Sequence, residues 1–266
     1  MTQKNKKLKI GILGFGNMGQ AIFSLLAKNS RNQEFLYFDI KNFRNLKKLK
    51  KINSIQDLYT QSDILFICIK PQDFANLEKI KTELKDNKKI IVSILVGISI
   101  SKLSKIFPGR IIRAMPNFPL QIGQGVIGWC TRAKLIKAEE KLVEEIFSQF
   151  GLSIRVKNEK MINSVTAVSG SGPAYVFLFL LALINGAVKL GFSRHDAAQM
   201  IRKTITGSIE LAFAEKDLKL DTLIKKITSK GGTTEAALKS INPKKFITSW
   251  QKAMKSAYDR AVELGK

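Results

Sequence analysis

A glycine-rich turn between an apolar strand and an apolar helix restricts this chain to few folds. Residues 8–13 form an apolar run that predicts a buried strand, and the sequence Gly-Phe-Gly-Asn-Met-Gly follows at residues 14–19. A helical pattern of apolar residues continues to residue 28. Glycines at this spacing, placed between a strand and a helix, are typical of the turn that binds the pyrophosphate of a dinucleotide.

Each of the three glycines has its own predicted role. Gly14 permits the tight turn, Gly16 lets the backbone approach the pyrophosphate, and Gly19 lets the helix pack closely on the strand. The free N–H groups at the start of a helix also favour a bound anion. A glycine turn without a ligand is the alternative. The predicted cofactor-binding turn consists of Gly14, Phe15, Gly16, Asn17, Met18 and Gly19.

The end of the predicted second strand bears on which cofactor binds. Asp39 ends that strand, twenty residues after Gly19. An acid here usually accepts hydrogen bonds from the adenosine ribose and repels a 2′-phosphate, which favours NADH. Lys41 and Arg44 follow closely and carry the charge to hold that phosphate, and Asp39 can also be a simple strand cap. The sequence therefore favours NADH only slightly over NADPH.

Short β-branched runs alternate with helical patterns through the first 157 residues. The runs cover residues 8–13, 35–39, 64–69, 90–96, 110–114, 125–130 and 152–156. The helical patterns lie near residues 17–28, 43–51, 72–85, 99–106 and 134–149. This alternation predicts an α/β fold, a doubly wound parallel sheet of the Rossmann type with helices on both faces.

Strand signals end near residue 158, and helical patterns follow. They lie near residues 159–190, 194–216, 218–228, 233–240 and 243–264. We therefore predict a dinucleotide-binding Rossmann domain over residues 1–157 and an all-helical domain over residues 158–266. Residues 163–188 carry no charge and are long enough to span a bilayer, but serines, glycines and a proline interrupt their first half. We expect a helix that packs against another subunit, and no membrane span.

Charge and cysteine usage bear on other classes of partner. Lys and Arg total 45 against 21 Asp and Glu, for a formal net charge of +24, which suits anionic ligands or nucleic acid. The lysines are spread along the chain without a nucleic-acid-binding motif, so we expect no nucleic-acid partner. Cys68 and Cys130 lack metal-ligand spacing, so we expect no metal. No apolar segment precedes a cleavage site near the N-terminus, which predicts a cytoplasmic protein.

Four further motifs accompany the glycine turn. They are Ile-Lys-Pro-Gln at 69–72, Arg-Ala-Met-Pro-Asn-Phe-Pro at 113–119, Val-Ser-Gly-Ser-Gly-Pro-Ala-Tyr at 168–175 and Ser-Lys-Gly-Gly-Thr-Thr-Glu-Ala at 229–236. In this order, and over essentially the whole chain, they resemble pyrroline-5-carboxylate reductase. The resemblance implies reduction of 1-pyrroline-5-carboxylate to L-proline by NADPH or NADH, the last step of proline biosynthesis. It also implies a homodimer joined through the helical domain, or a larger ring of dimers.

The resemblance also assigns residues to the site. The implied cofactor contacts are Lys70, Pro71 and the strand end from Ser93 to Gly97. The implied substrate contacts are Glu159, Thr166, Gly231, Gly232, Thr233 and Thr234. The glycines and threonines at 231–234 open a predicted helix, whose free N–H groups suit a carboxylate, although a plain helix cap has the same pattern. Thr166 and Thr234 are the candidate catalytic residues, because a hydroxyl can orient the proton on the imine nitrogen.

The chain departs from the family at three positions. Lys230 replaces a usual proline, Phe118 a usual threonine, and Lys226 an asparagine found in some relatives. A dehydrogenase of the β-hydroxyacid type is an alternative, with Lys160 near the position of its usual general base. A noncatalytic dinucleotide-binding relative is another.

Overall fold

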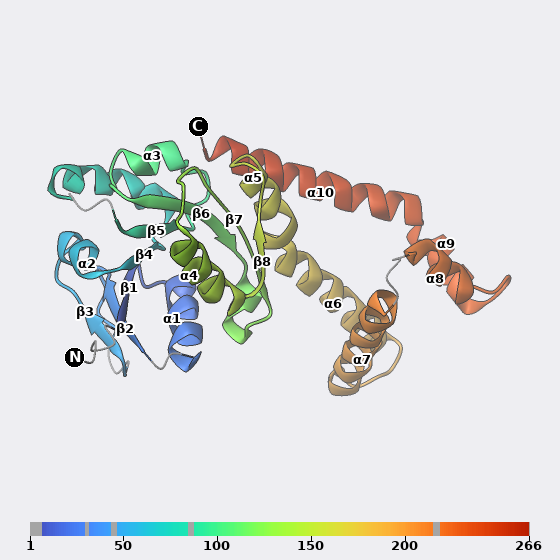
Figure 1. Ribbon diagram of the computed structural model, residues 1–266. Coiled ribbons are helices and arrows are strands. Elements are labelled where there is room, and N and C mark those ends of the chain that lie inside the picture. The colour runs from blue at the N-terminus through green and yellow to red at the C-terminus, as the bar shows by residue number, and fades with distance from the viewer. Residues whose placement is uncertain (1–6, 30–31, 44–46, 85–87, 215–218, 266) are drawn as a thin grey trace. The chain divides into compact units, whose positions relative to one another are not determined.

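The computed structural model describes residues 7–29, 32–43, 47–84, 88–214 and 219–265 (Figure 1). These residues form two compact units. The first runs to residue 173 and resumes at residue 256, and the second covers residues 174–255. The first unit therefore includes residues 158–173 and 256–265, which the sequence prediction assigned to the helical domain.

Close packing explains why these segments belong to the first unit. A side chain at Gly128, in the sheet, would begin 2.5 Å from Cγ2 of Val165. A side chain at Gly97 would collide with the carbonyl oxygen of Leu264. Both contacts need the absence of a side chain on a glycine, so composition and helical periodicity do not reveal them.

The first unit is built on one sheet, which has eight strands within the described residues. Their order is β3-β2-β1-β4-β5-β6-β7-β8, and all neighbours are parallel except β6 and β7. The strands are β1 (Leu8–Leu13), β2 (Gln33–Phe38), β3 (Leu49–Lys51), β4 (Ile64–Ile67), β5 (Ile90–Ser93), β6 (Arg110–Pro116), β7 (Gly125–Thr131) and β8 (Gly151–Arg155). The Rossmann-type prediction is confirmed, and within the described residues β6 and β7 form an antiparallel pair in this otherwise parallel sheet.

Strand order places the predicted cofactor residues at the carboxyl ends of neighbouring strands. The chain runs outward from β1 to β3 and then returns to β4, so the order reverses between β1 and β4. Leu13, at the end of β1, pairs with Ile67, which pairs in turn with Ser93. Because these strands are parallel, the loops after β1, β4 and β5 leave the sheet side by side. A reversal of this kind is the usual place for a ligand in such sheets.

The helices of the first unit differ from prediction between residues 43 and 61. The predicted helix at 43–51 is wrong where it is described, because Leu49–Lys51 pair with β2 as β3; residues 44–46 lie outside the described residues. Helix α2 was not predicted, although Ser54 caps it by accepting the N–H of Asp57 at 3.0 Å. The helices are α1 (Asn17–Asn29), α2 (Ile55–Gln61), η1 (Pro71–Glu83), α3 (Ile100–Ser104), η2 (Phe118–Ile122), α4 (Lys137–Ser148), α5 (Met161–Val165) and η3 (Thr166–Gly170).

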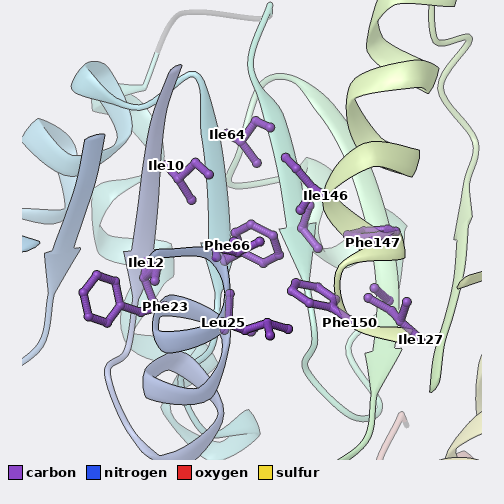
Figure 2. Close-up of a cluster of buried hydrophobic side chains, with 14 of the residues drawn as sticks. Ile10, Ile12, Phe23, Leu25, Ile64, Phe66, Ile127, Ile146, Phe147 and Phe150 are labelled. Carbon is purple, nitrogen blue, oxygen red and sulfur yellow. The ribbon is translucent and has the colours of Figure 1, made fainter. Parts of the chain in front are cut away.

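Two apolar clusters cover the two faces of the sheet. Alternate residues of the central strands join opposite clusters, so Ile12 enters one and Leu13 the other. Figure 2 shows the first cluster, where Ile10 and Phe66 from the strands lie with Leu25 from α1 and Phe147 from α4. The central strands are thus covered on both sides, which explains their nearly continuous apolar runs in the sequence.

All regular secondary structure in the described residues of the second unit is helical. The helices that contribute to it are α6 (Gly172–Lys189), α7 (Arg194–Phe213), α8 (Leu220–Lys226), α9 (Thr233–Ile241) and α10 (Pro243–Glu263), whose last residues return to the first unit. The predicted helix at 159–190 is divided into α5, α6 and a π-helical turn, η3, between them. Inside this unit the rings of Tyr175 and Trp250 lie 5.5 Å apart.

Candidate active site

The glycine turn has the geometry that a bound pyrophosphate requires. Gly14 has a φ of +89°, and an added Cβ would lie 2.7 Å from the backbone nitrogen of Ile69. An added Cβ at Gly19 would collide with the carbonyl oxygen of Gly14. At Gly16, by contrast, an added Cβ meets no atom within 4 Å. Two glycines are therefore needed to build the turn, and the third leaves its outer side open to a ligand.

Phe15 supplies the turn with an anchor in the core. Its side chain is buried, and its ring lies 4.9 Å from that of Tyr37 and 5.2 Å from that of Phe43. A cofactor therefore has only the backbone of Phe15 to contact. Asn17 is exposed at the start of α1, and Met18 is half-buried against the core.

Asp39 faces the glycine turn. Its Oδ2 accepts the backbone N–H of Phe15 at 2.6 Å, and its Oδ1 accepts the N–H of Lys41 at 2.8 Å. Both carboxylate oxygens thus hold backbone donors of this chain. The sequence expectation treated Asp39 as a ribose ligand or a strand cap and did not foresee the bond to the turn.

Lys70, Pro71, Ser93 and Gly97 follow the two neighbouring strands. Lys70 is exposed, and Pro71 begins η1 directly after it. Ser93 is fully buried, and its Oγ accepts the N–H of Leu95 at 3.4 Å. Gly97 has a φ of +80° and lies against the end of α10. Ser93 ends β5 and Lys70 and Pro71 follow β4, so these three lie at the end of the sheet that carries the glycine turn, and Gly97 lies further along the loop after β5.

A polar hollow of about 410 Å³ opens beside the start of α1. Most of its wall carries amide or hydroxyl groups, and Phe118 adds one aromatic ring. The lining residues are Asn17, Gln20, Ala21, Ser24, Phe118 and Gln121. Sequence reasoning did not find Gln20, Ser24 or Gln121, because they belong to no motif. Phe118, a departure from the family pattern, is half exposed on this wall.

Glu159 lies in a network of charges. Its Oε1 accepts the backbone N–H of Ile100 at 2.7 Å and lies 3.2 Å from Nη1 of Arg113; its Oε2 lies 2.9 Å from Nη2 of Arg132. Nη2 of Arg113 also donates to Oδ1 of Asn163 at 3.4 Å. Sequence reasoning gave neither arginine a role, although Arg113 opens the motif at 113–119 and was a usable signal. The predicted contact of Glu159 with a substrate stays a prediction.

Thr166 begins the π-helical turn η3. Its Oγ1 donates to the carbonyl oxygen of Ile162 at 2.8 Å, and its own carbonyl oxygen accepts the N–H of Ser171 at 2.8 Å. Turns of this type interrupt helices most often at functional sites. The hydroxyl oxygen keeps its acceptor capacity, so it can still accept a hydrogen bond from a ligand.

The loop at 231–234 belongs to the second unit. Gly231 has a φ of +76°, which favours glycine, and its N–H donates to Oε2 of Glu235 at 2.9 Å. Gly232 caps α9, and Thr233 and Thr234 form its first turn. Glu235 is itself paired with Lys239 at 3.2 Å. The loop therefore has a defined shape, and Lys230 lies exposed beside it.

Burial changes the chemistry of the two cysteines. It raises the pKa of the Cys68 thiol well above its ordinary value. Burial, helped by the negative charge of Glu159 and opposed by Arg113 and Arg132, raises the pKa of Cys130 to about 11. Within the described residues, no group of three or more His, Cys, Asp or Glu side chains is arranged to hold a metal ion.

Helix α6 exposes an unusual amount of apolar surface. None of its residues is buried, and the large side chains Val176, Phe177, Leu178, Phe179 and Leu181 are between 41% and 61% exposed. By length and composition, the helical stretch Met161–Lys189 is apolar enough to cross a membrane. A face of this kind on a soluble protein usually marks a protein interface.

Two family models match the chain. Residues 159–264 match the model described as pyrroline-5-carboxylate reductase dimerisation. Residues 9–97 match the model described as NADP oxidoreductase, coenzyme F420-dependent. The first covers α6 and the loop at 231–234, and the second covers the glycine turn, Asp39 and Lys70.

Curated relatives and solved structures match over nearly the full length. The pyrroline-5-carboxylate reductase of Aquifex aeolicus is 34% identical over 97% of this chain and 97% of its own. The structure of a Plasmodium falciparum pyrroline carboxylate reductase with NADP bound has 29% identity and a TM-score of 0.89, covering 98% of this chain and 99% of that one. The reductase of Streptococcus pyogenes has 28% identity and a TM-score of 0.86, covering 97% and 99%.

Proposed function

Because the chain belongs to the pyrroline-5-carboxylate reductase family, we propose that it reduces 1-pyrroline-5-carboxylate to L-proline with NADPH or NADH, the last step of proline biosynthesis. The observation that carries the proposal is the open glycine turn at the switch point of the sheet, in a chain that also has the Gly-Gly-Thr-Thr loop. Neither feature alone indicates an imine reductase.

The first unit holds the cofactor. The backbone of Gly14–Gly19 and the start of α1 receive its pyrophosphate, since Gly16 leaves room and helix starts favour anions. The carboxylate of Asp39 holds the glycine turn in its conformation. Contacts to the rest of the cofactor come from Lys70, Pro71 and the loop from Ser93 to Gly97. When bound, the cofactor supplies the hydride.

The second unit supplies the loop for the substrate. Gly231 and Gly232 give it a bare backbone, and the start of α9 offers N–H groups to the substrate carboxylate. The hydroxyl of Thr234 orients the proton on the imine nitrogen, which makes the adjacent carbon a better hydride acceptor; Thr166, in the first unit, is the alternative candidate for this role. Solvent can deliver that proton, so no strong general base is needed.

Assembly follows from the exposed face of α6. The enzyme is a homodimer in which α6 and its neighbours cover one another, because a single chain leaves α6 without a buried residue. Rings of dimers, a cytoplasmic location and the absence of a membrane span belong to the same proposal. The proposal also assigns cofactor binding to residues 1–157, and substrate binding and dimerisation to residues 158–266.

The experiment that tests this function is a cofactor-oxidation assay. Purified protein is mixed with 1-pyrroline-5-carboxylate and, separately, NADPH or NADH, and the loss of reduced nicotinamide absorbance is followed. We expect substrate-dependent oxidation of at least one cofactor. Oxidation of neither contradicts the proposal.

A further inference from the structure

One partly buried carboxylate connects two segments that carry proposed site residues. Glu159 lies just before α5, which leads to Thr166. Its Oε1 accepts the backbone N–H of Ile100, the first residue of α3, at 2.7 Å. The loop that precedes Ile100 runs back through Gly97 to the end of β5. Glu159 therefore ties this cofactor-binding loop to the α5 segment.

Two arginines that differ in solvent exposure pair with the Glu159 carboxylate. The Arg113 side chain is only 6% exposed, whereas that of Arg132 is 66% exposed. Arg113 also reaches Asn163 of α5, so it joins the turn at Glu159 to the helix that follows. A buried charge is costly unless it is paired and hydrogen-bonded, so Glu159 and Arg113 depend on each other's exact placement.

These contacts occupy both oxygens of Glu159 with donors from its own chain. The donors come from α3, β6 and the segment after β7, so the side chain fixes elements that are far apart in sequence. A charge-assisted hydrogen bond to a backbone N–H is short and directional, which suits it to fixing a loop. A residue engaged in this way is better suited to hold its neighbours than to recognise a substrate.

We propose that Glu159 is a positioning residue that holds the cofactor-binding loop between β5 and α3 against the start of α5. This inference takes the identity of the substrate from the proposed function. Its main test measures cofactor binding, which does not depend on that substrate. Because it concerns the loop, the affinity for NADPH in the absence of substrate is the quantity that must change.

The first test removes only the donor that reaches Glu159. Ile100→Pro deletes the backbone N–H, and proline is well tolerated at the first residue of a helix; Ser99 before it already has an extended backbone. Ile100→Ala is the matched control, since it truncates the same buried side chain and keeps the N–H. Binding is measured by NADPH fluorescence without substrate. We expect NADPH to bind Ile100→Pro at least about fivefold more weakly than Ile100→Ala, on the scale of one lost hydrogen bond; equal affinities overturn the proposal.

The second test removes the charge. Glu159→Gln is compared with Glu140→Gln, in which an exposed pair with Arg155 is lost instead. We expect Glu159→Gln to weaken NADPH binding and lower kcat, with little change in KM for 1-pyrroline-5-carboxylate. Unchanged NADPH affinity with a raised KM identifies a substrate ligand and overturns the proposal. If Glu159→Gln does not fold, the Ile100 pair decides alone. A protein that binds NADPH but does not reduce the imine still gives a clear answer, because binding is measured without substrate.

Discussion

The carboxylate of Asp39 accepts the backbone N–H of Phe15 across 2.6 Å, and this bond ties the end of β2 to the glycine turn. Its second oxygen accepts the N–H of Lys41, so the side chain is fixed at both oxygens. The bond does not depend on whether the cofactor carries a 2′-phosphate. Asp39 therefore supports the turn for NADH and NADPH alike.

The Asp39→Ala variant should bind both cofactors more weakly by a similar factor, about tenfold, because the turn loses a charged hydrogen bond. Affinities for NADH and NADPH are measured separately by fluorescence. Asp63→Ala is the control, since Asp63 accepts the N–H of Lys9 at 2.9 Å near the opposite end of β1. Loss of NADH binding alone would show that Asp39 is a ribose ligand and nothing more.

Substitutions at two glycines of the turn should have different effects, one on cofactor affinity and the other on stability. Gly16→Ala places a methyl group in open space, so the thermal midpoint should stay close to that of the unchanged protein while NADPH affinity falls at least about tenfold, since the ligand-facing backbone is then obstructed. Gly19→Ala collides with Gly14 and should lower the thermal midpoint instead. Calorimetry and fluorescence titration on both variants check this. A Gly16→Ala protein with unchanged affinity would place the pyrophosphate elsewhere.

Replacement of Thr234 by Ala should reduce kcat/KM by at least about tenfold, the scale of one lost functional hydrogen bond. Thr228→Ala is the matched control in the same unit, because the Thr228 hydroxyl donates to the carbonyl oxygen of Ile224, in the preceding helix α8, at 2.7 Å. Steady-state kinetics with varied 1-pyrroline-5-carboxylate measures both. Equal values for the two variants would remove Thr234 from the site.

Charge on the face of α6 should break the dimer. Leu178 is 61% exposed in the single chain, and Leu178→Lys places a charge where we expect the partner subunit. Ile40→Lys changes an even more exposed residue of the first unit and should leave the assembly intact. Light scattering gives the molar mass of each. A dimer in Leu178→Lys as stable as in Ile40→Lys would place the interface elsewhere.

Stability should fall in alkali partly through Cys130. Its folded pKa of about 11 lies above the ordinary value of 9.0, so the contribution is complete below pH 9 and is lost as the pH rises toward 11. Denaturant unfolding at several pH values should show a steeper alkaline decline for the unchanged protein than for Cys130→Ala. Parallel declines in the two proteins would contradict the assignment.

Much of the sheet was predictable because its strands are covered on both faces. Runs such as Ile64–Ile67 in β4 and Ile90, Ile91 and Val92 in β5 are continuously apolar, and turn signals set them apart. The short edge strand β3 escaped prediction because Leu49–Lys51 contains two lysines and is defined by pairing with β2. The reversed direction of β7 follows from the tight connection through η2, which no periodicity records.

The site was predictable where a motif fixes the backbone and less so where side chains meet from distant segments. The glycine turn follows from three residues and their neighbours. The Asp39–Phe15 bond joins residues 24 apart, and the Glu159–Arg113 pair joins residues 46 apart. Contacts of that kind depend on the completed sheet, so a single sequence does not indicate them.

The most direct test of the central claim is the formation of L-proline itself. Purified protein is incubated with 1-pyrroline-5-carboxylate and NADPH or NADH, and both L-proline and oxidised cofactor are quantified. The account predicts one L-proline for each cofactor oxidised, with the rate strongly reduced in Gly16→Ala. No L-proline with either cofactor, from protein that binds NADPH, would contradict it.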